Sequence, residues 1–248
     1  MSTFKRFWTL LIIAFIAAAA ISAQNSNSKN ASDEKSVEES YLQEAIELMI
    51  IKETSQSGSL DQKLLALQYI GEAIERGNTS DDIRQALEYL SMEGVMNQAR
   101  ENGRLVNNFP LARREAAKYL GQLGSKEAQT ALINICRYEP EPMVLQEAIK
   151  SLGDCADENS NALEAIVWIV GRFNVLNPDN LMALAAVDAI AKIANRNGGI
   201  KDPGAAALLI RIADGPYIRP VQNKARQVLN DLRKSNAQNK DKDKDKDK

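Results

Sequence analysis

The chain is poor in the residue types that most enzymes and nucleic-acid-binding proteins depend on. Its 248 residues include no histidine, 5% aromatic residues and two cysteines. The missing histidine excludes Ser-His-Asp and Cys-His catalysis, histidine-ligated zinc and histidine acid–base roles. The net charge of −2 lacks the basic excess that is typical of nucleic-acid-binding proteins. We therefore expect no catalytic residues, no metal site, no cofactor and no nucleic-acid partner.

β-Strand signals are also scarce, because no run alternates apolar and polar residues with β-branched enrichment. The abundant residues are Ala, Leu, Glu, Lys, Gln and Arg, which are strong helix formers. The composition therefore predicts an all-α protein.

The two cysteines, Cys136 and Cys155, fall near the ends of two consecutive predicted helices. In an antiparallel helical hairpin these ends lie at opposite poles, about 18 Å apart for helices of about 12 residues. A disulfide requires Cα atoms about 4.4–6.8 Å apart. We therefore predict two free, largely buried thiols.

The N-terminus has the pattern of an export signal. Lys5 and Arg6 precede an apolar run over 7–21, and small residues at Ser22 and Ala23 end it. We expect cleavage near Ala23 and a periplasmic or secreted protein without a transmembrane span. The alternative is an uncleaved N-terminal membrane anchor, although the run is short for a full span of about 20 residues. Without residues 1–23 the chain has 29 basic and 33 acidic residues, so its net charge becomes −4.

Polar segments flank the region that is able to form a core. Residues 24–35 are small and polar, which predicts a flexible leader. Residues 235–248 end in strictly alternating lysine and aspartate, which predicts a disordered tail. The folded domain is therefore expected over 36–234.

Within that domain, five stretches share one register. Five alanines are each followed four residues later by Ile or Leu, and the alanines are 50, 32, 38 and 39 residues apart. These alanines are Ala66, Ala116, Ala148, Ala186 and Ala225. A recurrence near 40 residues is typical of stacked helical hairpins. The expected hairpins cover 36–76, 81–124, 126–155, 160–196 and 202–234, and the longest helix covers 81–101.

The shared alanine predicts close approach of the two helices of a hairpin, with the branched residue one turn later filling the space beside it. In three stretches a glycine follows, at Gly71, Gly121 and Gly153. We expect these glycines to allow close contact with the preceding hairpin.

The second helices carry a resemblance to a known family. Ala116, Leu120 and Gly121 in LARREAAKYLGQLG, and Ala148, Leu152 and Gly153 in MVLQEAIKSLGDC, resemble HEAT repeats. The resemblance spans roughly 36–234 in five units and fits the second and third best. It implies a right-handed α-solenoid of about five antiparallel hairpins, with the second helices lining the concave side.

Basic residues recur on the second helices. Lys118 and Lys150 both stand two residues after the shared alanine, so stacking aligns them. The candidate protein-binding strip consists of Arg113, Arg114, Lys118, Lys150 and Lys192. Such a strip suits an acidic partner segment. The alternative is a solvated face that is paired with Glu115 and Glu147.

Trp168 lies in the apolar sequence IVWIV, so we expect it in the core. The alternative is an exposed aromatic anchor of an interface.

These features together predict an exported, non-catalytic adaptor or scaffold that binds a protein or peptide of the cell envelope on the concave face. A structural subunit of an envelope assembly, which uses the ends of the solenoid, is the alternative. A third hypothesis is an accessory enzyme that uses carboxylates, for which no paired acids are evident.

Overall fold

Helices make up nearly all of the regular structure that can be described. The computed structural model describes residues 37–157, 161–176, 178–200 and 202–246, so the predicted signal segment 1–23 and leader 24–35 lie outside the described residues. The helices are α2 (Val37–Ser55), α3 (Leu60–Glu75), α4 (Asp81–Met92), α5 (Pro110–Leu123), α6 (Lys126–Tyr138), α7 (Pro142–Cys155), α8 (Ala162–Leu176), α9 (Asn180–Arg196), α10 (Pro203–Asp214) and α11 (Arg219–Lys246). The prediction of an all-α fold is confirmed.

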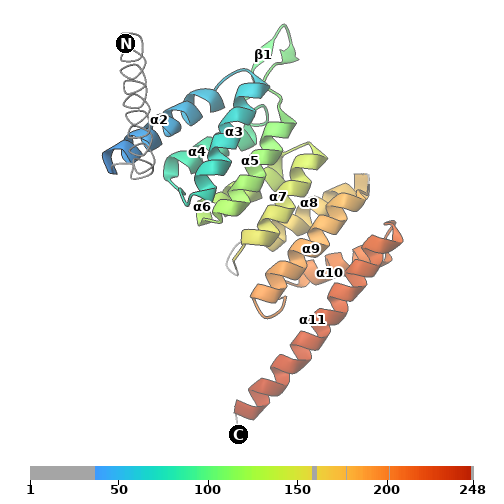
Figure 1. Ribbon diagram of the computed structural model, residues 1–248. Helices are drawn as coiled ribbons and strands as arrows, with labels where there is room; N and C mark the ends of the chain where they lie inside the picture. Colours follow the sequence, from blue (N-terminus) through green and yellow to red (C-terminus); the bar gives the residue numbers. More distant parts are fainter. Residues whose placement is uncertain (1–36, 158–160, 177, 201, 247–248) are drawn as a thin grey trace, which may run out of the picture. The chain divides into compact units, whose positions relative to one another are not determined.

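The chain divides into two compact units, residues 1–46 and 47–248. In the second unit the helices form two layers (Figure 1). The second helices of the hairpins, α3, α5, α7, α9 and α11, form one layer, and their most extensive contacts join α5 to α7 and α7 to α9. The first helices, α4, α6, α8 and α10, form the other layer. We call these the second-helix layer and the first-helix layer.

The five alanines of the shared register all lie in the core. Ala66, Ala116, Ala148, Ala186 and Ala225 are each 0% exposed. Most of the branched residues that follow, such as Leu120 and Leu152, are equally buried. The register therefore marks the line along which the second helices pack.

The glycines after these residues set the distance between neighbouring second helices. A Cβ atom at Gly121 would lie 2.6 Å from the Cβ of Ser151 on the next second helix, and one at Gly153 would lie 2.6 Å from the Cα of Ala189. Gly71 stands in the same relation to Tyr119. The predicted close contact is therefore present, but it is made with the following hairpin and not with the preceding one.

Helix boundaries follow local chemistry. Ser125 caps α6 by accepting a hydrogen bond from the Ala128 N–H at 3.1 Å, and Asp179 caps α9 through the N–H groups of Leu181 and Met182. Gly124 ends α5 in the left-handed region, with φ 63°. These caps keep the helices short and the connections tight.

The expected helix over 81–101 is wrong in its second half. Helix α4 ends at Met92, and the chain then forms an antiparallel hairpin of β1 (Arg100–Glu101) and β2 (Arg104–Leu105). Figure 1 shows this hairpin projecting from the connection between α4 and α5. Asn102 and Gly103 both have positive φ, 49° and 78°, as a type I′ turn requires. The Asn-Gly pair was the sequence signal for this turn.

The last helix continues further than expected. Helix α11 reaches Lys246, whereas residues 235–248 were expected to lack regular structure. No described helix combines the length and apolar character that a membrane span requires.

Candidate functional site

The structure separates the five predicted basic residues. Arg114, Lys118, Lys150 and Lys192 lie on the outer side of the second-helix layer, with side chains between 37% and 57% exposed. Arg113, in contrast, is 1% exposed. It points into the protein, where it donates hydrogen bonds to Glu139, the Glu93 carbonyl and Asn108. Its assignment to an exposed strip is therefore wrong.

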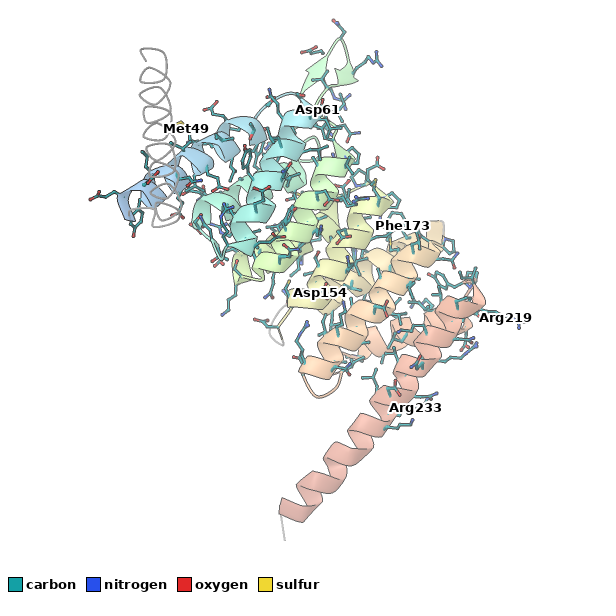
Figure 2. The ribbon with its side chains drawn as sticks, in the orientation of Figure 1. Met49, Asp61, Asp154, Phe173, Arg219 and Arg233 are labelled. Carbon is teal, nitrogen blue, oxygen red and sulfur yellow. The ribbon has the colours of Figure 1, made fainter. Side chains whose placement is uncertain are left out.

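The four exposed cations are paired on their own surface. Arg114 and Lys118 pair with Glu115, and Lys150 pairs with Glu147 at 3.1 Å. Lys192 of α9 pairs with Asp154 at 2.5 Å. Asp154 lies at the C-terminal end of α7 (Figure 2). The pairing with Glu115 and Glu147 considered above is thus present. Binding of a partner by these four residues stays a prediction.

The buried Arg113 belongs to a closed ionic network that anchors the start of α5. Its Nε and Nη2 atoms donate to the two carboxylate oxygens of Glu139, at 2.7 and 3.1 Å, and both side chains are almost fully buried. Its Nη1 atom donates to the Glu93 carbonyl and to the Asn108 side chain. This bidentate geometry, with further hydrogen bonds, is what a buried ion pair needs to be tolerated.

A second buried pair adjoins the first. The Lys63 ammonium lies 2.6 Å from the Glu93 carboxylate and donates to the Ser55 carbonyl. The centroids of the Tyr89 and Phe109 rings lie 5.5 and 5.6 Å from it. Burial, and then the Glu93 charge, raise the pKa of Tyr89. Each charge has its partner, so the network joins α3, α4, α5 and the α6–α7 turn and serves packing.

A cavity between α3 and α5 in the second-helix layer brings acidic side chains together with a tyrosine. This cavity of about 320 Å³ is lined by Gln68, Glu72, Glu75, Glu115 and Tyr119, with Leu64, Leu67 and Gly71. We call it the acid–tyrosine cleft. It brings three carboxyl groups and one phenol to a single surface hollow. Carboxyl and phenol groups are among the side chains that can transfer protons in a protein without histidine.

Contacts hold several side chains of the cleft in place. Gln68 donates from Nε2 to Glu72 Oε1 at 3.0 Å, and Glu115 accepts from Arg114 at 2.7 Å. The Lys118 ammonium lies 5.3 Å from the centroid of the Tyr119 ring. Two residues of the predicted strip, Arg114 and Lys118, therefore border this cleft.

The cleft depends on a glycine. A Cβ atom at Gly71 would lie 2.5 Å from the Tyr119 hydroxyl oxygen, so only glycine leaves room for this phenol against α3. The same place on the next second helices holds the small residues Ser151 and Ala189. A bulky tyrosine in a row of small residues, opposite a glycine, was the sequence signal for the cleft, and it was missed.

The expectation of a core position for Trp168 is wrong, since its side chain is 47% exposed. It lines a cavity of about 360 Å³ between α6 and α8, together with Arg137, Tyr138 and Glu164. The Arg172 guanidinium lies 5.7 Å from the Trp168 ring centroid. The alternative of an exposed aromatic side chain holds, because Trp168 is on the outer side of α8 between the buried Ile166 and Ile169.

The two cysteines are free, with Cys136 buried and Cys155 partly buried, as predicted. Burial raises the pKa of Cys136 to about 12 and that of Cys155 to about 11. Thiols with such pKa values are poor nucleophiles at neutral pH. Among the described residues, no cluster of three or more cysteine and acidic side chains has the arrangement of a metal site.

The fold and the repeat register define the class of α-solenoids, and comparison with known proteins supports the resemblance to HEAT repeats. Residues 112–138 match the PBS lyase HEAT-like repeat. No curated protein matches the chain. Among solved structures it is similar to the complex of CpcE and CpcF of phycocyanin lyase from Nostoc sp. PCC7120, with TM-score 0.53 and 20% identity over 75% of this chain. The matched part spans 64% of that chain, and at this identity the likeness shows the fold.

These matches contradict the expectation of a non-catalytic adaptor and that of a protein without enzyme activity. The matched repeat and the similar structure both carry the name of a lyase. Absence of histidine was therefore an inadequate reason to exclude catalysis, because carboxyl and phenol groups also transfer protons. The similar structure is also a complex of two subunits, which agrees with the prediction of a protein partner.

Proposed function

We propose that the protein is a lyase-type HEAT-repeat subunit that acts on a partner protein, with the acid–tyrosine cleft as its proton-transfer site. The observation that carries the proposal is the gathering of Glu72, Glu75, Glu115 and Tyr119 around one cavity of about 320 Å³. The lyase names of the matched repeat and the similar structure support the reaction class.

Lyases form or break a bond by addition or elimination, which requires one group to accept a proton and another to donate one. In the cleft, Glu72 and Glu75 are the candidate bases. Glu115 is engaged by Arg114, which suits it to positioning. The Tyr119 hydroxyl, set against Gly71, is the candidate donor. We assign the proton-donating role to Tyr119 because the phenol is the one O–H group in the cleft that does not belong to a carboxyl group.

The partner protein is proposed to lie along the outer side of the second-helix layer. Arg114 and Lys118 border the cleft, and Lys150 and Lys192 continue along neighbouring helices. We propose that these four cations orient an acidic segment of the partner. Their local ion pairs favour orientation over tight binding, since exposed pairs contribute about 0–1 kcal/mol each. The N-terminal export pattern supports a location in the cell envelope or outside the cell.

The test compares the mass of the partner protein in cells that express the full chain and in cells that lack it. The partner is first captured by photocrosslinking from a residue beside the cleft, such as Gln68. A lyase acting on it produces a mass difference between the two kinds of cell. Tyr119→Phe and Glu72→Gln are expected to abolish the difference and leave capture intact, because each removes one functional group and keeps the shape.

Tyr41→Phe, at an exposed tyrosine of α2, is the matched control and is expected to behave as wild type. If the partner has the same mass with and without the protein, the proposed reaction class is wrong. If Tyr119→Phe retains full activity, the cleft is not the reaction site.

A further inference from the structure

Three cavities beside the first helices of the hairpins repeat one design. Cavities of about 400, 320 and 360 Å³ lie between α2 and α4, between α4 and α6, and between α6 and α8. We call them grooves 1, 2 and 3. Each lies between consecutive first helices, and none is lined by a residue of the second helices.

One wall of every groove comes from the same register of its helix. An alanine forms the floor, and an aromatic or amide side chain stands three residues later. The floor residues are Ala86, Ala131 and Ala165, and the residues three positions on are Tyr89, Asn134 and Trp168. The polar residue just before each alanine also lines its groove, at Gln85, Thr130 and Glu164. Residues spaced in this way lie on one face of a helix.

The buried residues of α4, α6 and α8 confirm that the three helices are in the same register. The residues one and four positions after each floor alanine are 0% exposed in all three helices. They are Leu87 and Leu90, Leu132 and Ile135, and Ile166 and Ile169. The three helices therefore present the same face to the solvent. In α10 the register continues, but Leu208 replaces the alanine, and its larger side chain occupies the place of a groove floor.

We propose that grooves 1 to 3 bind one segment of a protein partner in the extended polyproline II conformation, with every third side chain of the segment seated in a successive groove. Neighbouring packed helices lie about 8–10 Å apart. A polyproline II segment has three residues per turn and advances about 3.1 Å per residue, so every third side chain points the same way and three residues cover about 9 Å. The groove spacing and the chain spacing therefore match without strain.

The side chains around groove 3 select the residue that enters it. Trp168 and Tyr138 offer exposed aromatic surface. Arg137 and Arg172 are exposed, and within the described chain neither has a carboxylate partner. Groove 3 therefore takes an aromatic or aliphatic side chain that has an acidic residue beside it.

Groove 2 has the opposite preference. Glu88 and Glu127 line it, beside Asn134 and Arg84, and Arg84 already pairs with Glu88 and Asp81. A lysine, arginine or amide side chain of the partner suits this groove. The occupant is thus an extended segment in which an acid-flanked aromatic or aliphatic residue stands three residues from a basic or amide residue.

This surface is independent of the acid–tyrosine cleft, because the cleft lies between α3 and α5 in the other layer. A failure of the lyase proposal leaves the groove proposal standing, and the reverse also holds.

The test is selection of a random dodecapeptide phage library on the immobilised full chain. We expect enriched peptides to share an acid-flanked aromatic or aliphatic residue, with a basic or amide residue three positions away. Trp168→Ala and Arg137→Glu are each expected to weaken binding of an enriched peptide by about tenfold or more, as at aromatic and arginine hot spots. Arg233→Glu, at an exposed arginine on α11 (Figure 2), is the matched charge control and is expected to change nothing.

Thermal unfolding followed by circular dichroism checks that each variant folds, and Tyr138→Ala, at an exposed side chain, replaces Trp168→Ala if that variant does not fold. The proposal is overturned if no peptide is enriched over an empty surface. It is equally overturned if enriched peptides bind Trp168→Ala and Arg137→Glu as tightly as wild type, or if Lys150→Glu on the second-helix layer removes their binding instead.

Discussion

The two layers of this solenoid use small residues in different ways. In the second-helix layer, Gly121 and Gly153 let the next helix approach until no Cβ atom fits between the backbones. In the first-helix layer, Ala131 and Ala165 are the floors of grooves that no neighbouring helix fills. Small residues thus allow close helix contact in the second-helix layer and leave grooves in the first-helix layer. We call these the closed layer and the open layer.

This difference has a geometric origin. The helices of each hairpin are joined, so tight contact among second helices fixes the spacing of the units. First helices must accept that spacing, and wherever their facing residues are small a groove remains. The second-helix layer therefore holds the units together, and the first-helix layer keeps open surface between its helices. The acid–tyrosine cleft is the exception in the closed layer, since Tyr119 stands where other second helices place a small residue.

The largest effect is expected from the buried ionic network around Arg113, which joins the two layers. Arg113→Ala leaves the buried Glu139 carboxylate without its partner and is expected to lower the free energy of unfolding by about 3–5 kcal/mol. Denaturant unfolding followed by circular dichroism measures this change. Arg114→Ala, one residue along on the exposed side, is the control and is expected to cost no more than about 1 kcal/mol. Equal losses at the two positions would contradict the assignment of Arg113 to the interior.

The next largest loss of stability is expected from the buried apolar residues of the shared register. Leu152→Ala removes a fully buried side chain of α7 and is expected to cost about 2–5 kcal/mol. Trp168→Ala removes a larger side chain from the open layer but is expected to change the free energy of unfolding by only about 0.5 kcal/mol, as at other surface positions. The same unfolding experiment sharpens the comparison, and a larger loss at Trp168 than at Leu152 would reverse it.

A smaller effect is expected from adding one methyl group to the closed layer. The new Cβ of Gly153→Ala meets the Ala189 backbone and is expected to cost about 1–3 kcal/mol through overpacking. Gly58→Ala is the matched control, because nothing lies within 4 Å of its Cβ position. There we expect no loss, or a gain of about 0.4–1 kcal/mol from a less flexible unfolded chain. Thermal melting of the two variants side by side decides whether close helix approach is required.

The smallest effect is expected from the thiols at alkaline pH. Burial raises the pKa of Cys136 to about 12 and that of Cys155 to about 11, whereas an unfolded thiol ionises near pH 8.5. Their contribution to stability is therefore complete below about pH 8.5 and is lost as the pH rises towards 11–12, because the unfolded state releases protons first. Unfolding of the wild type and of the double variant Cys136→Ala, Cys155→Ala between pH 7 and 10.5 measures it. The wild type should lose more stability over this range, and parallel curves would show that neither thiol is shielded.

Much of the closed layer could be predicted from the sequence, because its contacts obey a local rule. The spacing of Ala116 and Leu120 predicts the packed face of α5, and the same spacing recurs in four other helices. The site was harder to predict, because it depends on which helix lies opposite. Gly71 makes room for Tyr119, 48 residues further along the chain. The direction of that contact, towards the following hairpin, cannot be read from either residue alone.

The errors have physical causes. Arg113 and Lys118 are both basic residues of α5, so the sequence alone does not distinguish them. Their separation of five residues places them on different sides of the helix. Trp168 was expected in the core because its neighbours are apolar, but those neighbours cover a wide face and leave Trp168 outside it. The register of Ala86, Ala131 and Ala165 was present in the sequence as well. It could have been noticed, although only the structure tells a groove floor from a helix contact.

Accessibility of Trp168 tests the contrast between the layers most directly. The full chain with Trp8→Phe has Trp168 as its single tryptophan, so its fluorescence reports on groove 3 alone. An open first-helix layer predicts a red-shifted emission that acrylamide and iodide quench readily in the folded protein. A blue-shifted emission that iodide does not reach until the protein unfolds would place Trp168 in the core and contradict the account.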